Sequence, residues 1–241
     1  MSYLITFMLI SFLILIHELG HFIAAKLSNI PIEIFSIGFG PKLWSFRIGQ
    51  TEYRISALPI AGYVLPKMED PEDFFNIDSS RRIAFALGGP LANIILALIC
   101  LGLLNALTTG FSFYAVLISP FVQLISITSQ FVHALPSLFS SPDKLSGVIG
   151  IVAMGGQLVA GDYLNILNLA LILNINLAIL NMLPILPLDG GKIIFCLLEK
   201  IHRSLIRLQI PLTVTGWVLL LGLLAYVTVL DMCKYVFKIY A

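Results

Sequence analysis

Apolar residues run through this chain in long stretches, and four of the stretches are long enough to cross a membrane. A spanning helix needs about 20 consecutive, mostly apolar residues. The four stretches are Tyr3–Ala25, Ile83–Leu107, Leu164–Leu188 and Ile210–Leu230. The pattern therefore predicts an α-helical polytopic membrane protein with four transmembrane helices.

A fifth apolar segment, residues 111–138, is less regular. It lies in a region without Asp, Glu, Lys or Arg, but it is interrupted by Ser, Thr, Gln, His and Pro. That mixture is typical of a helix that lies at the membrane interface or re-enters the membrane. We interpret residues 111–138 as an interfacial or re-entrant helix.

The segment that follows the first predicted helix has a different pattern. Residues 32–64 alternate apolar and polar positions in places, and Gly38, Gly40, Gly49 and Gly62 interrupt them. Alternation broken by glycines predicts short β-strands joined by turns. Because many of these residues are apolar, we expect a β-hairpin loop that lies against the membrane or re-enters it. The alternative is a hairpin on the cytoplasmic surface.

Composition agrees with a membrane protein. Of the 241 residues, 59% are hydrophobic and only 11% are charged, whereas soluble domains carry about 25% charged residues. The net charge of +1 gives no reason to expect a nucleic-acid partner, and membrane lipid is the expected environment. Cys100, Cys196 and Cys233 are far apart in apolar surroundings, so neither a disulfide nor a cysteine zinc site is expected. The first apolar run lacks a basic start and a small-residue cleavage site, which favours a retained helix.

The distribution of Lys and Arg predicts the orientation. Basic residues gather at residues 26–82 and 189–209, and they are scarce between 107 and 162. Cytoplasmic loops carry the excess of positive charge. Both basic stretches are therefore expected in the cytoplasm with both termini outside, and this arrangement requires four spans.

The sequence HELGH, His17 to His21, places polar chemistry near the end of the first apolar stretch. On a helix, residues four apart share a face, so His17 and His21 can hold one Zn²⁺. Zinc lowers the pKa of a bound water to about 7, and Glu18 can accept its proton. An ionisable residue inside a spanning segment indicates function; the alternative is a polar packing cluster between helices.

A catalytic zinc usually has three protein ligands, and three residues are candidates for the third. Asp189, in NMLPILPLDGG, ends the third predicted span, while His133 and His202 lie in other segments. With four spans, Asp189 reaches the same side of the membrane as His17 and His21. Four spans place His133 on the outer side of the membrane, which favours Asp189 as the third ligand. The alternatives are that His202 is the third ligand, or that the LDGG sequence is only a turn that caps a helix.

Several motifs together resemble the site-2 protease family of intramembrane zinc metalloproteases. HELGH pairs with NMLPILPLDGG, and FSIGFGPKLW, TEYRISALPIAGYV, RRIAFALGGPLAN and SGVIGI resemble the bacterial branch that includes the regulator-of-sigma-E protease. The similarity implies that His17, His21 and Asp189 bind zinc and that Glu18 is the general acid/base. It implies a role for Asn181 in catalysis, on the oxyanion side or in positioning the substrate.

The same resemblance implies two substrate-binding elements. Asn176 matches a family asparagine, and Gly38, Phe39 and Gly40 match the family's membrane-reentrant β-loop, which is thought to pair with the unwound substrate. Asn93, in GGPLAN, is interpreted as a packing residue, with Gly88 and Gly89 allowing close helix approach.

The resemblance implies one membrane-embedded metalloprotease domain, residues 1–241, in the bacterial inner membrane. Its substrates would be single-span membrane proteins or signal-peptide remnants, cut near the cytoplasmic side. The branch usually carries PDZ domains between the second and third spans, and residues 108–162 are too few and too apolar to hold one. A partner protein would then have to act as the adaptor that selects substrates.

Two other functions use the same residues. A metal transporter should place ligands along its length and often shows repeat symmetry, whereas the candidates here cluster at one depth without a repeat. A catalytically inactive scaffold that binds transmembrane segments would not need the intact HELGH motif together with Asp189.

Overall fold

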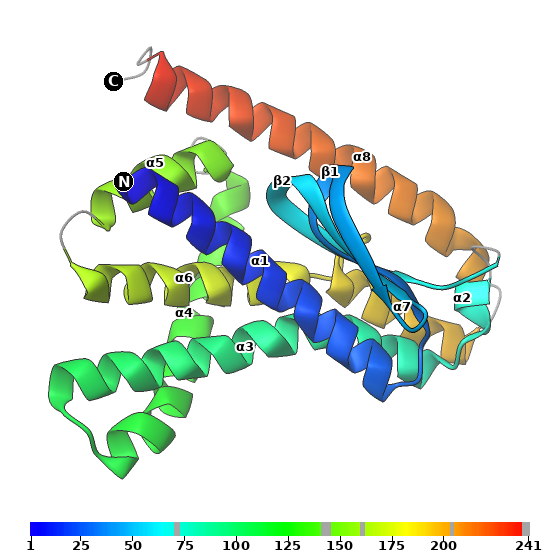
Figure 1. Cartoon of the computed structure of the whole chain (residues 1–241), viewed down its shortest axis with the longest axis horizontal. Helices are drawn as coiled ribbons and strands as arrows, with labels where there is room; N and C mark the ends of the chain where they lie inside the picture. Colours follow the sequence, from blue (N-terminus) through cyan, green and yellow to red (C-terminus); the bar gives the residue numbers. More distant parts are fainter. Residues whose placement is uncertain (70–72, 141–145, 160–161, 203–204, 238–241) are drawn as a thin grey trace. The chain divides into compact units, whose positions relative to one another are not determined.

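The computed structural model describes residues 1–69, 73–140, 146–159, 162–202 and 205–237, and it is mostly helical (Figure 1). The elements of the first half are α1 (Ser2–Leu27), β1 (Ile32–Ile48), β2 (Thr51–Pro66), α2 (Asp73–Asn76) and α3 (Ser79–Thr109). Those of the second half are the π-helical turn η1 (Tyr114–Ile118), α4 (Ser119–Ser140), α5 (Val148–Leu158), α6 (Tyr163–Asn181), α7 (Asp189–Ile201), α8 (Ile206–Asp231) and a second π-helical turn, η4 (Met232–Val236).

Five helical segments of the described chain are long and apolar enough to cross a membrane. They are Ser2–Leu27, Ser79–Thr109, Tyr114–Pro136, Tyr163–Asn181 and Leu208–Val236. The chain therefore has the character of an integral membrane protein. The expectation of four spans is not confirmed, because Tyr114–Pro136, within the segment interpreted as interfacial, also meets the length and composition of a span.

The third predicted span ends earlier than expected. Helix α6 stops at Asn181 and not at Leu188, and Asp189 begins a separate helix, α7. Proline lacks the N–H that a helix interior needs, so Pro184 and Pro187 divide the run into two helices joined by turns. Gly190 makes the joint compact, since a Cβ there would lie 2.2 Å from the carbonyl oxygen of Met182.

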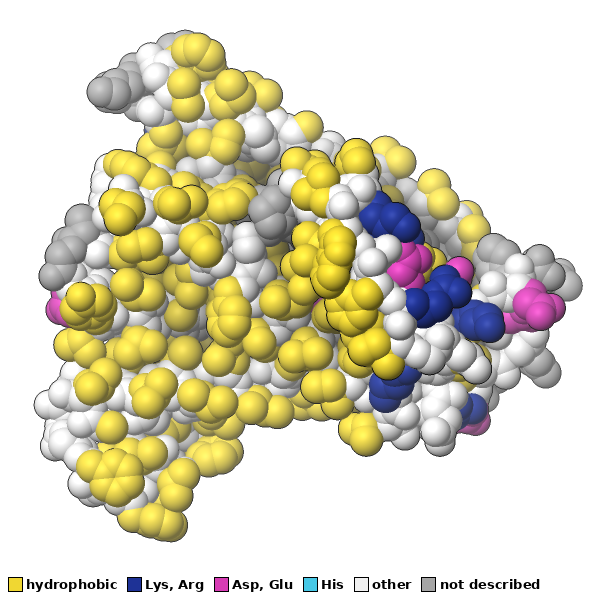
Figure 2. Space-filling model, in the orientation of Figure 1, with side chains coloured by type: hydrophobic (Ala, Val, Ile, Leu, Met, Phe, Trp, Pro, Cys, Tyr) yellow, Lys and Arg dark blue, Asp and Glu magenta, His cyan; other side chains and the backbone are white. Residues whose placement is uncertain are grey.

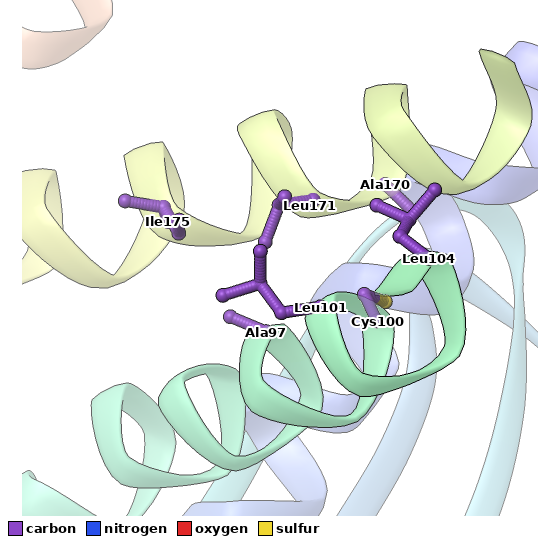
Figure 3. Close-up of a cluster of buried hydrophobic side chains, with 7 residues drawn as sticks. All are labelled: Ala97, Cys100, Leu101, Leu104, Ala170, Leu171 and Ile175. Carbon is purple, nitrogen blue, oxygen red and sulfur yellow. The ribbon is translucent and has the colours of Figure 1, made fainter. Parts of the chain in front are cut away.

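One compact unit comprises residues 1–9, 95–179 and 217–241. Its core lies where α3 packs against α6, and Figure 3 shows the side chains of the two helices meeting. The buried residues are Ala97, Cys100, Leu101 and Leu104 of α3 and Ala170, Leu171 and Ile175 of α6. Cys100 is a free cysteine buried in this cluster.

The other unit comprises residues 10–94 and 180–216. Its buried cluster joins the end of α1 to the start of β1 and α3 through Ala25, Ile30, Ile32 and Phe85. In Figure 2 the charged side chains on the visible face gather around the β-hairpin and α2, both in this unit, while hydrophobic side chains cover much of the rest. The unit therefore combines lipid-compatible surface with a small polar region.

The hairpin extends over residues 32–66, and each of its strands is bent. Ile32 lies opposite Pro66 and Ile48 lies opposite Thr51, as in an antiparallel pair. Ser36, however, lies opposite both Tyr63 and Arg54, so the first half of β1 has neighbours on both sides. Among the described residues, the segment from Gly62 to Pro66 pairs on one side only and is an edge of the sheet.

Candidate metal centre

His17, His21 and Asp189 come together in the unit formed by residues 10–94 and 180–216. The Nε2 atoms of His17 and His21 lie 3.2 Å apart. Asp189 Oδ2 lies 3.2 Å from the first of these nitrogens and 3.1 Å from the second. All three side chains are buried. The two sequence motifs, 168 positions apart in the case of His21 and Asp189, therefore supply one site.

The first helical turn of α7 places Asp189 against the turn that precedes it. The backbone at Gly190 and Gly191 contacts residues 182–186 so closely that a Cβ on either glycine would lie within 2.6 Å of backbone atoms. Only glycine fits at such an approach. The LDGG sequence is thus more than a cap, because its glycines allow the carboxylate to reach the histidines.

Helix α3 packs against the two imidazoles through the backbone of its glycines. A Cβ on Gly89 would lie 2.5 Å from His21 Nε2 and 2.6 Å from His17 Nε2. A Cβ on Gly20 of α1 would lie 2.2 Å from the carbonyl oxygen of Gly88. The prediction that Gly88 and Gly89 allow close helix approach is confirmed, and the approach brings α3 onto the site itself.

Each histidine has an outer partner on α3. His21 Nδ1 lies 2.8 Å from the carbonyl oxygen of Phe85, and His17 Nδ1 lies 3.0 Å from Asn93 Nδ2. Because a carboxamide can present either its oxygen or its nitrogen, the Asn93 oxygen can accept a hydrogen bond from Nδ1–H. Asn93 was interpreted as a packing residue, and its contact with His17 corrects that interpretation. The signal in the sequence is its position one helical turn after Gly89.

The hydrogen bond to Phe85 determines which nitrogen of His21 carries the proton. The N–H of Gly89 also lies 3.3 Å from His21 Nδ1, but the Phe85 carbonyl is closer and can only accept. The proton of a neutral His21 is therefore on Nδ1, which leaves a bare lone pair on Nε2. That lone pair faces Asp189 Oδ2 at 3.1 Å.

Two acceptors at this distance repel one another unless a cation lies between them. Asp189 Oδ2 is buried, and no group of the described residues donates a hydrogen bond to it. Zinc binds nitrogen and oxygen ligands tetrahedrally at about 2.0–2.2 Å, so its ligand atoms lie roughly 3.3 Å apart. The observed separations of 3.1–3.2 Å are close to that value, and the three residues fit a zinc ion.

Two charged side chains adjoin the three ligands. Lys192, one turn after Asp189 on α7, places Nζ 2.9 Å from Asp189 Oδ1. Glu18 interacts electrostatically with His17, His21 and Asp189. Its side chain lies against β2, because a Cβ on Gly62 would be 3.0 Å from Glu18 Cγ. The Glu18 side chain therefore lies next to both the ligand cluster and the sheet.

The remaining sequence candidates are distributed differently. His202 is exposed at the far end of α7, and among the described residues the group of potential ligands consists of His17, His21 and Asp189. Asn181 ends α6 within the same unit, while Asn176 and His133 belong to the other unit. The roles of Asn181 and Asn176 stay predictions.

The loop with Gly38, Phe39 and Gly40 forms the bend in β1. Gly38 and Gly40 both have φ of +89°, a conformation that favours glycine. Phe39 is exposed, and Gly38 lines a cavity next to α1. The substrate-binding role of this loop stays a prediction.

Comparison with known families adds to this geometry. The family model described as Peptidase family M50 matches residues 5–224, which is nearly the whole chain. That match includes both parts of the ligand cluster.

Curated relatives share the name "Putative zinc metalloprotease". One from Clostridium acetobutylicum is 50% identical over 90 residues, which cover 35% of this chain and 26% of the relative. One from Chlamydia trachomatis is 39% identical over 150 residues, which cover 54% of this chain and 24% of the relative. The chain thus spans about a quarter of the length of these two relatives.

A relative from Clostridium perfringens aligns more completely. It is 27% identical over 333 positions, which cover 94% of this chain and 98% of the relative. The alignment is longer than the 241 residues of this chain. That relative therefore carries residues that have no counterpart here.

Proposed function

This chain belongs to peptidase family M50, and from that premise we propose that it is an intramembrane zinc endopeptidase. Its substrates would be the transmembrane segments of single-span membrane proteins, or signal-peptide remnants. The observation that carries the proposal is the cluster of His17, His21 and Asp189 beside Glu18. Two of these ligands and the glutamate lie on α1, a helix apolar enough to span a membrane.

The residues divide the work of peptide hydrolysis. When bound, zinc supplies Lewis acidity toward the scissile carbonyl and toward water. Glu18 takes the proton from the attacking water and returns it to the leaving amine, as a general base and then a general acid. Asn93 and the Phe85 carbonyl hold the two imidazoles in orientation through their Nδ1 atoms. Asn181 would donate a hydrogen bond toward the developing oxyanion.

A substrate helix must unwind before it is cut, because its carbonyls are hydrogen-bonded within the helix. The edge segment from Gly62 to Pro66 offers a place for the extended form, since a strand can add to a free sheet edge. Gly62 lies against the side chain of Glu18. An extended segment on this edge would therefore pass close to the catalytic carboxylate.

We also propose that α4 does not cross the membrane, which keeps the four-span topology. His17, His21 and Asp189 meet, so the crossings between α1 and α7 must return the chain to the same side. If Tyr114–Pro136 crossed, α5 would have to reverse it before α6. Helix α5 has 11 residues, about 16 Å, whereas the apolar core is about 30 Å thick.

The remaining parts of the proposal concern location and partners. We place the protein in the inner membrane of a bacterium, with both termini outside and the metal centre toward the cytoplasm. The basic residues between α1 and α3 support this orientation. Because residues 108–162 are too few and too apolar to hold a PDZ domain, we propose that a separate adaptor protein selects substrates for this chain.

The test of the proposed function is cleavage of a tagged single-span reporter protein co-expressed with the wild type or with Glu18→Gln. We expect the wild type to cut and the variant to lose at least 100-fold, the usual contribution of a general base, while it keeps its zinc. Equal cleavage by both proteins, or none by either across a panel of reporters, would refute the proposal. Zinc content measured on both proteins separates loss of the base from loss of the site.

A further inference from the structure

A small cavity lies between α1 and the β-hairpin, next to Glu18. Its volume is about 160 Å³, and it belongs entirely to the unit formed by residues 10–94 and 180–216. It is lined by Ser11, Phe12 and Leu15 of α1, by Ser36, Ile37 and Gly38 of β1 and by Gly62 of β2. Of the three elements that form it, α1 carries Glu18 and β2 lies against the Glu18 side chain at Gly62.

The position of the cavity relative to Glu18 follows from the helix. Ser11, Leu15 and Glu18 are spaced by four and three residues, so they lie on one face of α1. At 1.5 Å per residue, Leu15 lies about 5 Å and Ser11 about 10 Å along the helix from Glu18. Gly62 closes the connection, because it lines the cavity and lies against Glu18 Cγ.

The size of the cavity indicates one side chain. Sites for small molecules usually measure about 300–1,000 Å³, and this cavity is only about half of the lower value. It still holds several times the roughly 30 Å³ that one water molecule takes in the liquid. In an extended peptide, side chains on one face repeat every two residues, about 6.8 Å. A residue close to the cleaved bond would therefore reach the cavity.

The chemistry of the lining indicates an apolar side chain. The hydroxyl of Ser36 is committed within the sheet, to the Gly38 carbonyl oxygen at 3.0 Å and to Ser56 Oγ at 3.1 Å. Phe12 is 48% exposed and Ile37 is 38% exposed, so apolar surface stands open beside the cavity. Burial of a substrate side chain there would remove that surface from contact with water or loose lipid.

We propose that this cavity is the subsite that binds an apolar, medium-sized side chain of the substrate within two residues of the cleaved bond. The inference rests on the proposed function and adds its side-chain specificity. Leu15 and Ser11 set the depth and width of the subsite. Gly38 lines the cavity with its backbone alone. A Cβ at this position would lie 2.9 Å from two carbonyl oxygens of β2.

The test uses reporter substrates that differ at one position near the cleaved bond, with Gly, Ala, Leu, Phe or Trp placed there in turn. Leu15→Ala enlarges the subsite, so we expect cleavage of the Phe or Trp reporter to rise at least tenfold relative to the Leu reporter. Ser11→Leu fills it, so we expect the Leu reporter to fall at least tenfold relative to the Ala reporter. Pocket changes of this size in enzymes give effects of about 10–200-fold.

Ile23→Ala is the matched control, because it removes a similar volume from an exposed position of α1 outside the cavity. Cleavage of the Ala reporter by each variant shows that the protein folds. A ranking of reporters that stays the same in Leu15→Ala and in Ser11→Leu would overturn the subsite alone. Failure of the wild type to cut any reporter would instead overturn the proposed function, and the subsite with it.

Discussion

Lys192 Nζ lies 2.9 Å from Asp189 Oδ1, the carboxylate oxygen that faces away from the two histidines. The contact leaves only Oδ2 directed at the site and balances the charge of the carboxylate. Outer partners of this kind orient a metal ligand, and their loss usually costs 10–100-fold in metal affinity. Lys192→Met is therefore expected to weaken zinc binding by about that factor, as measured by competition with a chelator.

The control for this prediction lies on the same helix. Lys200 is exposed and eleven residues from Asp189 on α7, so Lys200→Met removes the same charge without touching the site. Lys192→Arg should restore much of the affinity. A zinc affinity that is the same in Lys192→Met and in the wild type would show that the contact does not position Asp189.

Asn93 supplies the second prediction, since its carboxamide lies 3.0 Å from His17 Nδ1. Asn93→Ala should lower zinc affinity by about tenfold or more, because His17 then loses the group that fixes its orientation. Asn93→Asp should retain affinity, since a carboxylate accepts a hydrogen bond from Nδ1–H. The cobalt-substituted protein offers a direct readout, because its visible absorption reports ligand geometry. A spectrum unchanged in Asn93→Ala would count against this role.

These contacts show which parts of the site can be predicted from sequence. The i, i+4 spacing of His17 and His21 and the position of Asp189 after a long apolar run point to one cluster, and the structure brings the three residues together. The fold of the apolar segments is predicted less completely. Pro184 and Pro187 indicate a break before Asp189, but hydropathy gives helix length and not helix ends, so the predicted end of the third span, Leu188, lies beyond Asn181, where α6 ends.

The outer partners of the ligands are harder to predict. The sequence does not show whether the Asn93 amide packs between helices or orients a metal ligand, because an asparagine can do both. The close approach of α3 to α1 directs it at His17. An alternating pattern also does not predict the bends in β1 and β2. Alternation indicates strands, but it does not show which segments pair. The outer partners and the strand pairing depend on contacts between segments that are distant in the sequence, and a local pattern does not show such contacts.

Buried Arg82 and half-buried Glu199 form an ion pair that joins the start of α3 to the end of α7. Arg82 is 1% exposed and also donates to the Ile77 carbonyl oxygen at 3.0 Å. Removing one partner of a buried pair leaves an uncompensated charge, which costs about 3–5 kcal/mol. Glu199→Gln is therefore expected to lower stability markedly, measured by thermal unfolding in detergent.

The double variant Arg82→Met with Glu199→Leu tests the reason for that loss. Because it removes both charges together, it should be clearly more stable than Arg82→Met alone. A loss of stability in the double variant equal to the sum of the losses in Arg82→Met and Glu199→Leu would mean that the two charges act independently.

Glu52 makes the stability of the hairpin depend on pH in the acidic range. Hydrogen bonds from Arg54 and then Lys42 and Ser45 lower the pKa of Glu52 to about 2 from its ordinary value of 4.5. A carboxyl with a lowered pKa stabilises the fold above its unfolded pKa, and the contribution is lost as the pH falls from about 4.5 to about 2. The contacts across the hairpin should loosen over that range.

Trp44 is a suitable reporter, because it lies on β1 in contact with Phe46 at 5.1 Å between ring centroids. In a Trp217→Phe background, Trp44 fluorescence should change between pH 4.5 and 2. Glu52→Gln should have little change in this range, since it lacks the titrating group. An identical transition in both proteins would assign the change to another carboxyl.

The topology around α4 can be decided by labelling introduced cysteines from each side of the membrane. Ser112 precedes α4 and Tyr163 follows α5, and both are exposed, as is Gln50 in the hairpin turn. If α4 does not cross, Ser112→Cys and Tyr163→Cys are labelled from the same side, and Gln50→Cys from the opposite side. The three native cysteines are replaced first to remove background. Labelling of positions 112 and 163 from opposite sides would show an odd number of crossings between them and would exclude the four-span arrangement.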